Sequence, residues 1–118
     1  MEEIIFQMIQ MEQQMRIFHW QTKSYARHQA FGMVYGALGE LIDSFVEAAM
    51  GKYGRVKVGG PIELDNIGSD IEGKVDEYIT FLVGVTDKLD QANDTDLLNI
   101  RDEILGLMNK LKYLLTLK

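Results

Sequence analysis

The two histidines, His19 and His28, and two acids, Asp43 and Glu47, are the residues in this sequence best suited to metal chemistry. Imidazole nitrogens and carboxylate oxygens together suit iron, manganese and zinc. Residues four apart share one face of a helix, so Asp43 and Glu47 can present both carboxylates to one ligand. Asp43 nevertheless lies about 22 Å beyond His28 if a single helix joins them. One chain therefore cannot close this site.

The spacing instead predicts a site shared by two chains. The histidines of one copy would meet the acids of the other if two helices pair antiparallel about a two-fold axis. One face of the expected helix carries glycines together with the acids, namely Gly32, Gly36, Gly39, Asp43 and Glu47. Glycine inside a helix costs about 1 kcal/mol relative to alanine, so several on one face indicate close packing. We therefore expect a symmetric dimer whose helices cross close to Gly36, midway between the histidine and the acids.

His19, which precedes a tryptophan, His28, Asp43 and Glu47 resemble the Dps-like branch of the ferritin-like superfamily, whose small proteins oxidise and store iron. The resemblance implies that the two histidines bind iron together with the two acids of the two-fold partner. The family has a further acid four residues after the second histidine, where this chain has Gly32. The departure predicts a weaker site that binds metal without turnover. The chain also resembles short, uncharacterised ferritin-like proteins associated with viruses, a resemblance that implies no activity.

The composition excludes several classes of function. With no cysteine, the chain cannot form disulfides, iron–sulfur clusters or thiolate zinc sites. Its 18 acids and 12 bases give a net charge of −6, which predicts no binding to nucleic acid or to an anionic membrane. No apolar run reaches the roughly 18 residues of a membrane span, and no signal-peptide pattern precedes the first helix. We expect a cytoplasmic protein with a single domain at residues 1–118.

Apolar residues that recur every three or four positions predict four amphipathic helices. Their expected ranges are about 2 to 23, 25 to 50, 69 to 91 and 95 to 117. Ser24 is the expected N-cap of the second helix, and Gly51 is its expected end. A second apolar set on the opposite side of the first helix consists of Phe6, Ile9, Ile17 and Trp20. That set predicts a second packing partner, so we expect a homo-oligomer, at least a dimer, that forms through the first two helices.

Residues 51–68 join the second and third helices without a helical period, and they contain the only proline. About 18 extended residues reach about 59 Å, whereas a helix of about 22 residues spans about 33 Å, so this segment can return along the whole bundle. The third helix would then run parallel to the second. This arrangement is an all-α, ferritin-like four-helix bundle with a long crossover. An internal di-iron centre is rejected, because residues 69–117 contain no histidine for the Glu-x-x-His pairs of an ordinary ferritin.

Two functions follow from these patterns. The first is binding of iron, with manganese and zinc as alternatives, at two equivalent dimer sites, together with weak ferroxidase or iron-sequestering activity. The second is a non-catalytic homo-oligomeric helical module without metal, in which the same face serves only assembly. Whether the protein is an enzyme stays open, and no residue is assigned a catalytic role.

Overall fold

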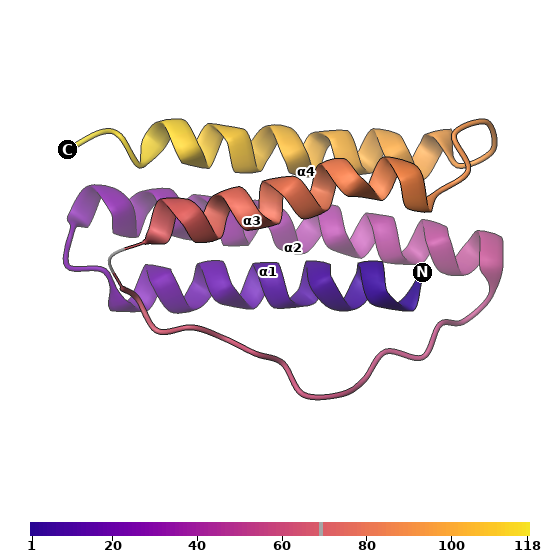
Figure 1. The fold of residues 1–118 in the computed structure, drawn as a ribbon, viewed down its shortest axis with the longest axis horizontal. Coiled ribbons are helices and arrows are strands. Elements are labelled where there is room, and N and C mark those ends of the chain that lie inside the picture. Colours follow the sequence, from indigo (N-terminus) through magenta and orange to yellow (C-terminus); the bar gives the residue numbers. More distant parts are fainter. Residues whose placement is uncertain (69) are drawn as a thin grey trace.

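The chain folds as a bundle of helices, seen in a computed structural model that describes residues 1–68 and 70–118 (Figure 1). The elements are α1 (Glu2–Gln21), α2 (Tyr25–Tyr53), α3 (Ile71–Gly84), the 3-10 helix η1 (Val85–Lys88) and α4 (Thr95–Leu114). Within the described ranges there is no strand. The prediction of an all-α helical bundle is therefore confirmed.

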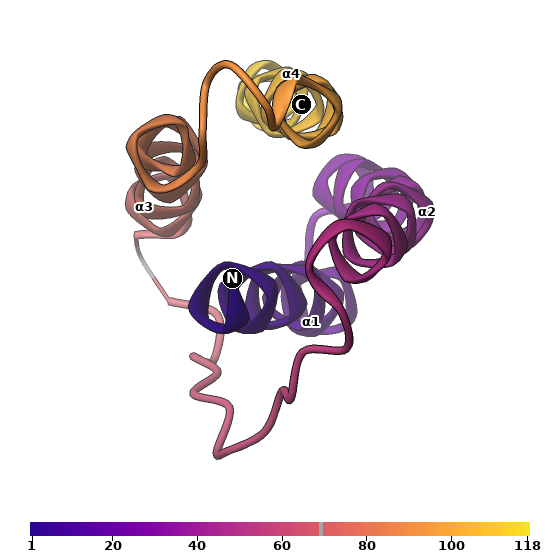
Figure 2. The same cartoon turned by 90° about the vertical axis from the view of Figure 1, so that its right-hand side faces the viewer.

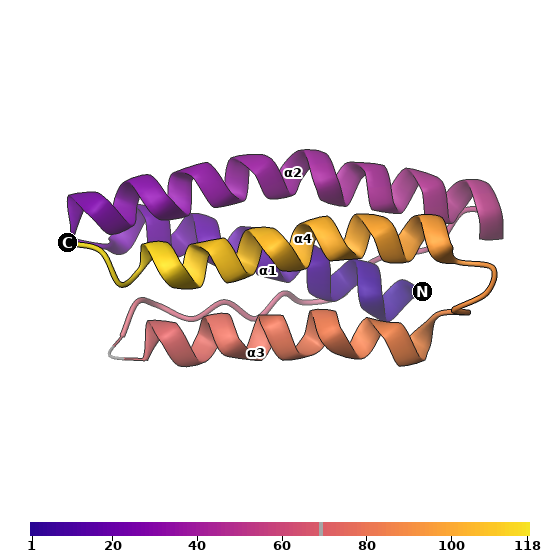
Figure 3. The same cartoon turned by 90° about the horizontal axis from the view of Figure 1, so that it is seen from above.

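The helices run in the directions that the long connection predicts. In Figures 1 and 3, α1 and α2 are antiparallel, the crossover returns along the bundle, α3 runs parallel to α2, and α4 returns antiparallel to α3. Viewed along the bundle in Figure 2, α1 lies beside α2, α2 beside α4 and α4 beside α3. The outer face of the α1–α2 pair therefore points away from α3 and α4.

The core consists of the apolar stripes of all four helices. Each stripe recurs at steps of three and four, which places its residues on one side of the helix. The largest fully buried side chains are Phe31, Phe45, Ile5, Met8, Met11, Met15, Leu38, Leu82, Leu97, Ile104, Met108 and Leu111. The second apolar set of α1 lies outside this core. In that set Phe6, Ile9 and Ile17 are half-buried and Trp20 is 64% exposed.

The second helix continues beyond the predicted end at Gly51 and stops at Tyr53. Contacts with the start of α4 hold this additional turn, because the Lys52 ammonium lies 3.0 Å from a carboxylate oxygen of Asp94 and the Tyr53 hydroxyl donates to the same oxygen. Hydrogen bonds from the Tyr53 hydroxyl, the Asp90 backbone amide and Lys52 lower the pKa of Asp94 to about 2. Gly54 then ends the helix with φ 86°, a backbone conformation that favours glycine.

The third helix is shorter than predicted, ending at Gly84 and continuing only as the 3-10 turn η1. Arg101 of α4 explains this end, because its guanidinium donates to the Leu82 carbonyl at 2.9 Å and to the Thr86 hydroxyl at 2.7 Å. A side chain from α4 thus satisfies a carbonyl at the end of α3. The predicted start of this helix at residue 69 lies outside the described residues. The first and fourth helices end two and three residues before their predicted ends at 23 and 117.

Glutamine side chains of α1 fix the path of the crossover. Gln14, which is fully buried, donates to the Asp65 carbonyl at 2.8 Å and accepts from the Asp65 amide at 2.7 Å. The side-chain amide thereby pairs with the extended backbone as a neighbouring strand would. Gln10 and Gln21 add hydrogen bonds to the amides of Glu63 and Ile67. These contacts hold residues 63–67 of the crossover along α1, whereas most of the segment before them is exposed.

We predict that Gln14→Met lowers the free energy of unfolding by about 1–2 kcal/mol, because two hydrogen bonds to Asp65 are lost while the volume is kept. Urea denaturation gives the stability, and hydrogen exchange at the Asp65 amide gives the local effect. The matched control is Gln13→Met, since the Gln13 amide makes no hydrogen bond to any described residue. Equal stability and equal exchange in the two variants would show that the pairing does not hold the crossover.

Candidate metal centre

The two histidines lie together where α1 ends and α2 begins. A three-residue turn joins the helices, and the Ser24 hydroxyl accepts from the Arg27 amide at 3.3 Å, which confirms Ser24 as the N-cap of α2. The turn brings the rings of His19 and His28 into a stack, with centroids 3.9 Å apart and planes inclined by 17°. The sequence placed these residues at the same end of the bundle, and the structure brings them into direct contact.

Each imidazole binds the backbone of the other histidine. The Nδ1 atom of His19 lies 2.7 Å from the carbonyl oxygen of His28, and the Nδ1 atom of His28 lies 2.8 Å from the carbonyl oxygen of His19. A carbonyl oxygen only accepts, so each Nδ1 carries the proton and donates it. In the neutral form each Nε2 then presents a lone pair. This tautomer, oriented by a backbone carbonyl, is the one that metal-ligating histidines commonly adopt.

Gly32 gives the His19 ring its place against α2. A Cβ atom added to Gly32 would lie 2.8 Å from Cε1 and 3.0 Å from Nδ1 of His19, closer than such contacts occur. The ring cannot move aside freely, because it is stacked on His28 and bonded to its carbonyl. The stacked histidine pair and a side chain at position 32 are therefore incompatible. This contact explains why glycine occupies the position where the Dps-like pattern has an acid.

Within one chain the structure does not bring the acids to the histidines. Asp43 and Glu47 are exposed on the outer side of α2. The helix is continuous from Tyr25 to Tyr53, so Asp43 lies about 22 Å from His28 along its axis. Among the residues that the structure describes, no group of three or more His, Cys, Asp or Glu side chains is arranged to hold a metal ion. The acids can complete the centre only from a second chain.

Sequence reasoning missed two neighbours of the histidine pair, Tyr35 and Arg16. The Tyr35 ring meets His19 edge to face at a centroid distance of 5.2 Å, and the Arg16 guanidinium lies over the same ring at 4.8 Å. The signal was present in the spacing, since Tyr35 follows His28 by two helical turns and Arg16 precedes His19 by almost one. The seam between α1 and α2 is therefore lined by rings and one cation.

Three of the four glycines of α2, namely Gly32, Gly36 and Gly39, lie on the predicted dimer face, and their environments differ. Gly39 faces α1, where a Cβ atom would lie 3.5 Å from a carboxylate oxygen of Glu12, whereas nothing lies within 4 Å of the corresponding position at Gly36. Burial raises the pKa of Glu12, and the positive charge of Arg16 acts against that shift. Contacts with side chains of α1 thus account for the glycines at positions 32 and 39 within a single chain. Gly36 alone of the three opens outward without a described neighbour, as a helix crossing would require.

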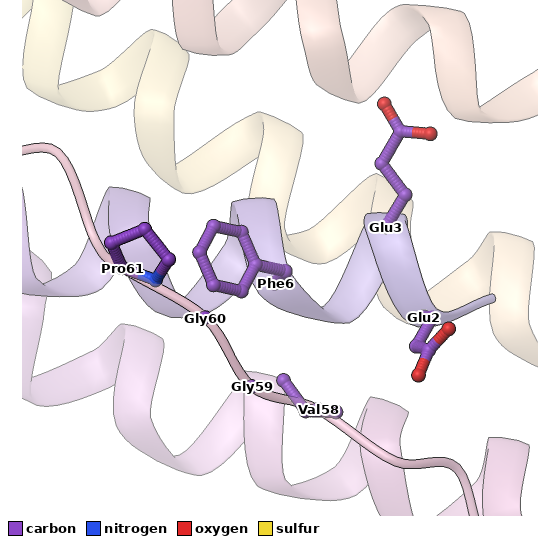
Figure 4. A pocket seen from close by; sticks show the side chains of 7 residues that line it. All are labelled: Glu2, Glu3, Phe6, Val58, Gly59, Gly60 and Pro61. Atoms are coloured by element: carbon purple, nitrogen blue, oxygen red, sulfur yellow. The ribbon is translucent and has the colours of Figure 1, made fainter.

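A hollow at the opposite end of α1 belongs to the crossover and not to the histidines. Its volume is about 410 Å³, and its lining consists of Glu2, Glu3, Phe6, Val58, Gly59, Gly60 and Pro61. Figure 4 shows the Phe6 ring beside Pro61, with the backbone of Gly59 and Gly60 passing close by. The crossover thus covers part of the second apolar set of α1, which the sequence had assigned entirely to another partner. Trp20, at the other end of α1, remains exposed.

The structure is that of an all-helical bundle with a long crossover after its second helix. A family model described as "Family of unknown function (DUF5856)" matches residues 19–115, and the chain belongs to this family. The match contains both histidines and both acids of the candidate centre. The chain is also 29% identical over 100 residues to an "Uncharacterized 14.6 kDa protein in mobD-ri intergenic region" of Enterobacteria phage T4, covering 85% of this chain and 75% of that protein. No solved structure matches the chain.

Neither the family description nor the phage protein's name assigns an activity. Membership of the ferritin-like superfamily therefore stays a prediction from the four residues of the candidate centre and the helix order. In the part of the chain that the structure describes, none of the helices combines the length and apolarity of a membrane span.

We predict that Gly32→Ala displaces the His19 ring, because the added methyl group would occupy its space. Alanine normally gains about 1 kcal/mol over glycine inside a helix, and Gly106→Ala on α4, where nothing lies within 4 Å, should show that gain. Gly32→Ala should show less than half of it or lose stability, and the His19 ring resonances should shift. Equal stabilisation in both variants with unchanged His19 resonances would contradict this contact.

Proposed function

We propose that the protein forms a two-fold dimer through the outer face of α1 and α2 and binds iron at two shared sites. Each site uses His19 and His28 of one copy with Asp43 and Glu47 of the other. The observation that carries the proposal is the pair of reciprocal hydrogen bonds, because it fixes both histidines as Nδ1–H tautomers and leaves both Nε2 atoms for a ligand. The resemblance to the Dps-like proteins supports iron as the ion.

The chemistry of the donors supports a transition metal over calcium or magnesium. Two imidazoles and two carboxylates suit iron, manganese or zinc, whereas calcium and magnesium prefer oxygen ligands alone. The imidazole planes are inclined by only 17°, so both Nε2 lone pairs reach one ion only after the stacked rings turn apart. The proposal therefore includes this turn of the rings when iron binds, and the carboxylates of the second copy complete the donor set.

The contact at Gly32 favours a centre that binds iron over one that also oxidises it. A carboxylate at that position would collide with the His19 ring, so the centre has one acid fewer than the Dps-like pattern. Fewer negative ligands stabilise ferric iron less, and we therefore propose that the protein binds and sequesters ferrous iron, with weak ferroxidase activity at most. No residue is assigned a catalytic role.

A second candidate function is assembly without metal, and the same histidine contacts favour it. The carbonyl of His19 belongs to the last turn of α1, which has no partner further along its helix, and His28 satisfies it. The histidine pair therefore already has a structural role as a clasp between α1 and α2. In this alternative the outer face forms the same dimer and the acids remain solvated.

We predict that iron binding falls at least tenfold in His28→Asn and in Glu47→Ala. Asparagine can still donate to the His19 carbonyl but lacks Nε2, so His28→Asn removes the ligand and keeps the clasp, whereas His28→Ala removes both. Glu47 is exposed, so its loss leaves the fold intact. Isothermal titration calorimetry of tag-free protein with ferrous iron, carried out anaerobically, measures the affinity.

The control for this titration is Glu103→Ala, an exposed acid on α4 far from the outer face of α1 and α2. It should bind iron as the parent does. If the parent takes up no ferrous iron although it is dimeric, the assembly function holds and the metal function is wrong. If His28→Asn binds iron like the parent, the histidine is not a ligand.

We predict that Gly36→Leu disrupts the dimer and leaves the fold of the single chain intact. Nothing lies within 4 Å of the Cβ position at Gly36, so a leucine fits the monomer but would separate two α2 helices that cross there. Sedimentation velocity at micromolar concentration measures the state, with Gly106→Leu as the same change on α4. A monomeric parent, or a dimeric Gly36→Leu, contradicts a crossing at Gly36.

A further inference from the structure

Arg16 is a cation without a counter-ion on the face that the proposed dimer uses. Its guanidinium lies over the Tyr35 ring at 4.8 Å, and its Nε atom is buried and has no hydrogen-bond partner. None of the ion pairs between described residues includes Arg16. By contrast, Arg27 pairs with Glu72 at 2.7 Å, and Arg101 reaches two oxygen atoms at the end of α3. A planar guanidinium held in one orientation is suited to a carboxylate.

Glu12, one turn earlier on α1, is a charged neighbour of Arg16. Burial raises the pKa of Glu12, and the interaction with Arg16 is electrostatic without a hydrogen bond. Glu12 instead lies against α2, with an oxygen 3.5 Å from the Cβ position of Gly39. Arg16 therefore donates no hydrogen bond to a described residue, and its side chain is only partly buried.

The outer side of α2 carries the complementary charge. Glu40, Asp43 and Glu47 are exposed there together with the open Gly36. Each chain therefore presents one unpaired guanidinium on the α1–α2 seam and three carboxylates on the neighbouring helix. A surface of this kind complements a second copy of itself, because a two-fold axis places the cation of each copy opposite the acids of the other.

The register of the proposed dimer determines which carboxylate of the second copy lies nearest to Arg16. Arg16 is level with Tyr35 across the seam, and an axis at Gly36 sets Tyr35 opposite residue 37 of the second α2. Glu40 lies three residues from that point, about 4.5 Å along the helix, whereas Asp43 lies about 9 Å away and Glu47 further still. Glu40 is thus the nearest carboxylate. Asp43 and Glu47 remain opposite the histidines.

We propose that Arg16 pairs with Glu40 of the partner subunit and that these two equivalent ion pairs set the register of the dimer. The inference rests on the dimer of the proposed function and adds a contact that involves no metal. The unpartnered guanidinium, its fixed position on Tyr35 and the charge of the opposing face carry it. The partner is a second copy of this chain.

The test is a charge exchange measured as the dimer dissociation constant by sedimentation equilibrium, with EDTA present to remove metal. We expect Arg16→Glu and Glu40→Arg each to raise the constant at least tenfold, because each sets like charges against one another. The double variant restores opposite charges and should return to within about threefold of the parent. Lys110→Glu, the same charge change at an exposed position on α4, is the control and should dimerise as the parent does.

The outcomes separate this inference from the proposed function. Arg16→Glu and Glu40→Arg dimers as tight as the parent, or a double variant weaker than both single variants, overturn the ion pair and leave the shared metal site standing. Recovery in the double variant supports the pair even if the parent binds no iron. A monomeric parent overturns both proposals. Glu40 is exposed and makes no contact that the fold requires, so Glu40→Arg decides the matter if Arg16→Glu fails to fold.

Discussion

The long crossover sets the order of the helices, and the pairing of Gln14 with the backbone of Asp65 attaches that crossover to α1. A parallel α2 and α3 require the chain to travel the length of the bundle between them, and an extended segment exposes its amides and carbonyls along the way. The fully buried Gln14 satisfies both polar groups of Asp65, and Gln10 and Gln21 bind amides on either side. The crossover is thereby attached to α1, and it closes over Phe6 near the start of that helix. Another partner can contact only the part of the outer face of α1 that the crossover leaves uncovered.

The histidine pair shows how one geometry can serve both structure and chemistry. Each ring donates to the carbonyl of the other residue, which closes the end of α1 onto the first turn of α2. The same two bonds fix the tautomer that a metal ligand needs. This arrangement restricts position 32, where only glycine leaves room for the stacked His19 ring. The glycine at a position where the Dps-like pattern has an acid is thus required by the packing of the two histidines.

Charge on the outer face of α1 and α2 is unbalanced within one chain. Arg16 lacks a counter-ion, while Glu40, Asp43 and Glu47 have no cation beside them among the described ion pairs. Elsewhere several ion pairs join helices of the same chain, as between Lys52 and Asp94 or Arg27 and Glu72. The contrast supports the proposal that this face is completed by a second copy. Trp20 is exposed, and the backbone at Gly36 has open space beside it.

The sequence by itself determined the four helices, their directions and most of the core, because apolar spacing and the length of the crossover depend only on local geometry. It also identified the histidines and the acids, and it showed that one helix keeps them about 22 Å apart. Only the tertiary structure decided where α2 and α3 end, since Asp94 and Arg101 act from α4 across the bundle. It alone revealed the stacked imidazoles, the role of Gly32 and the position of Arg16 on Tyr35. Those features depend on which side chains meet when two antiparallel helices pack, and the spacing along either helix does not contain that information.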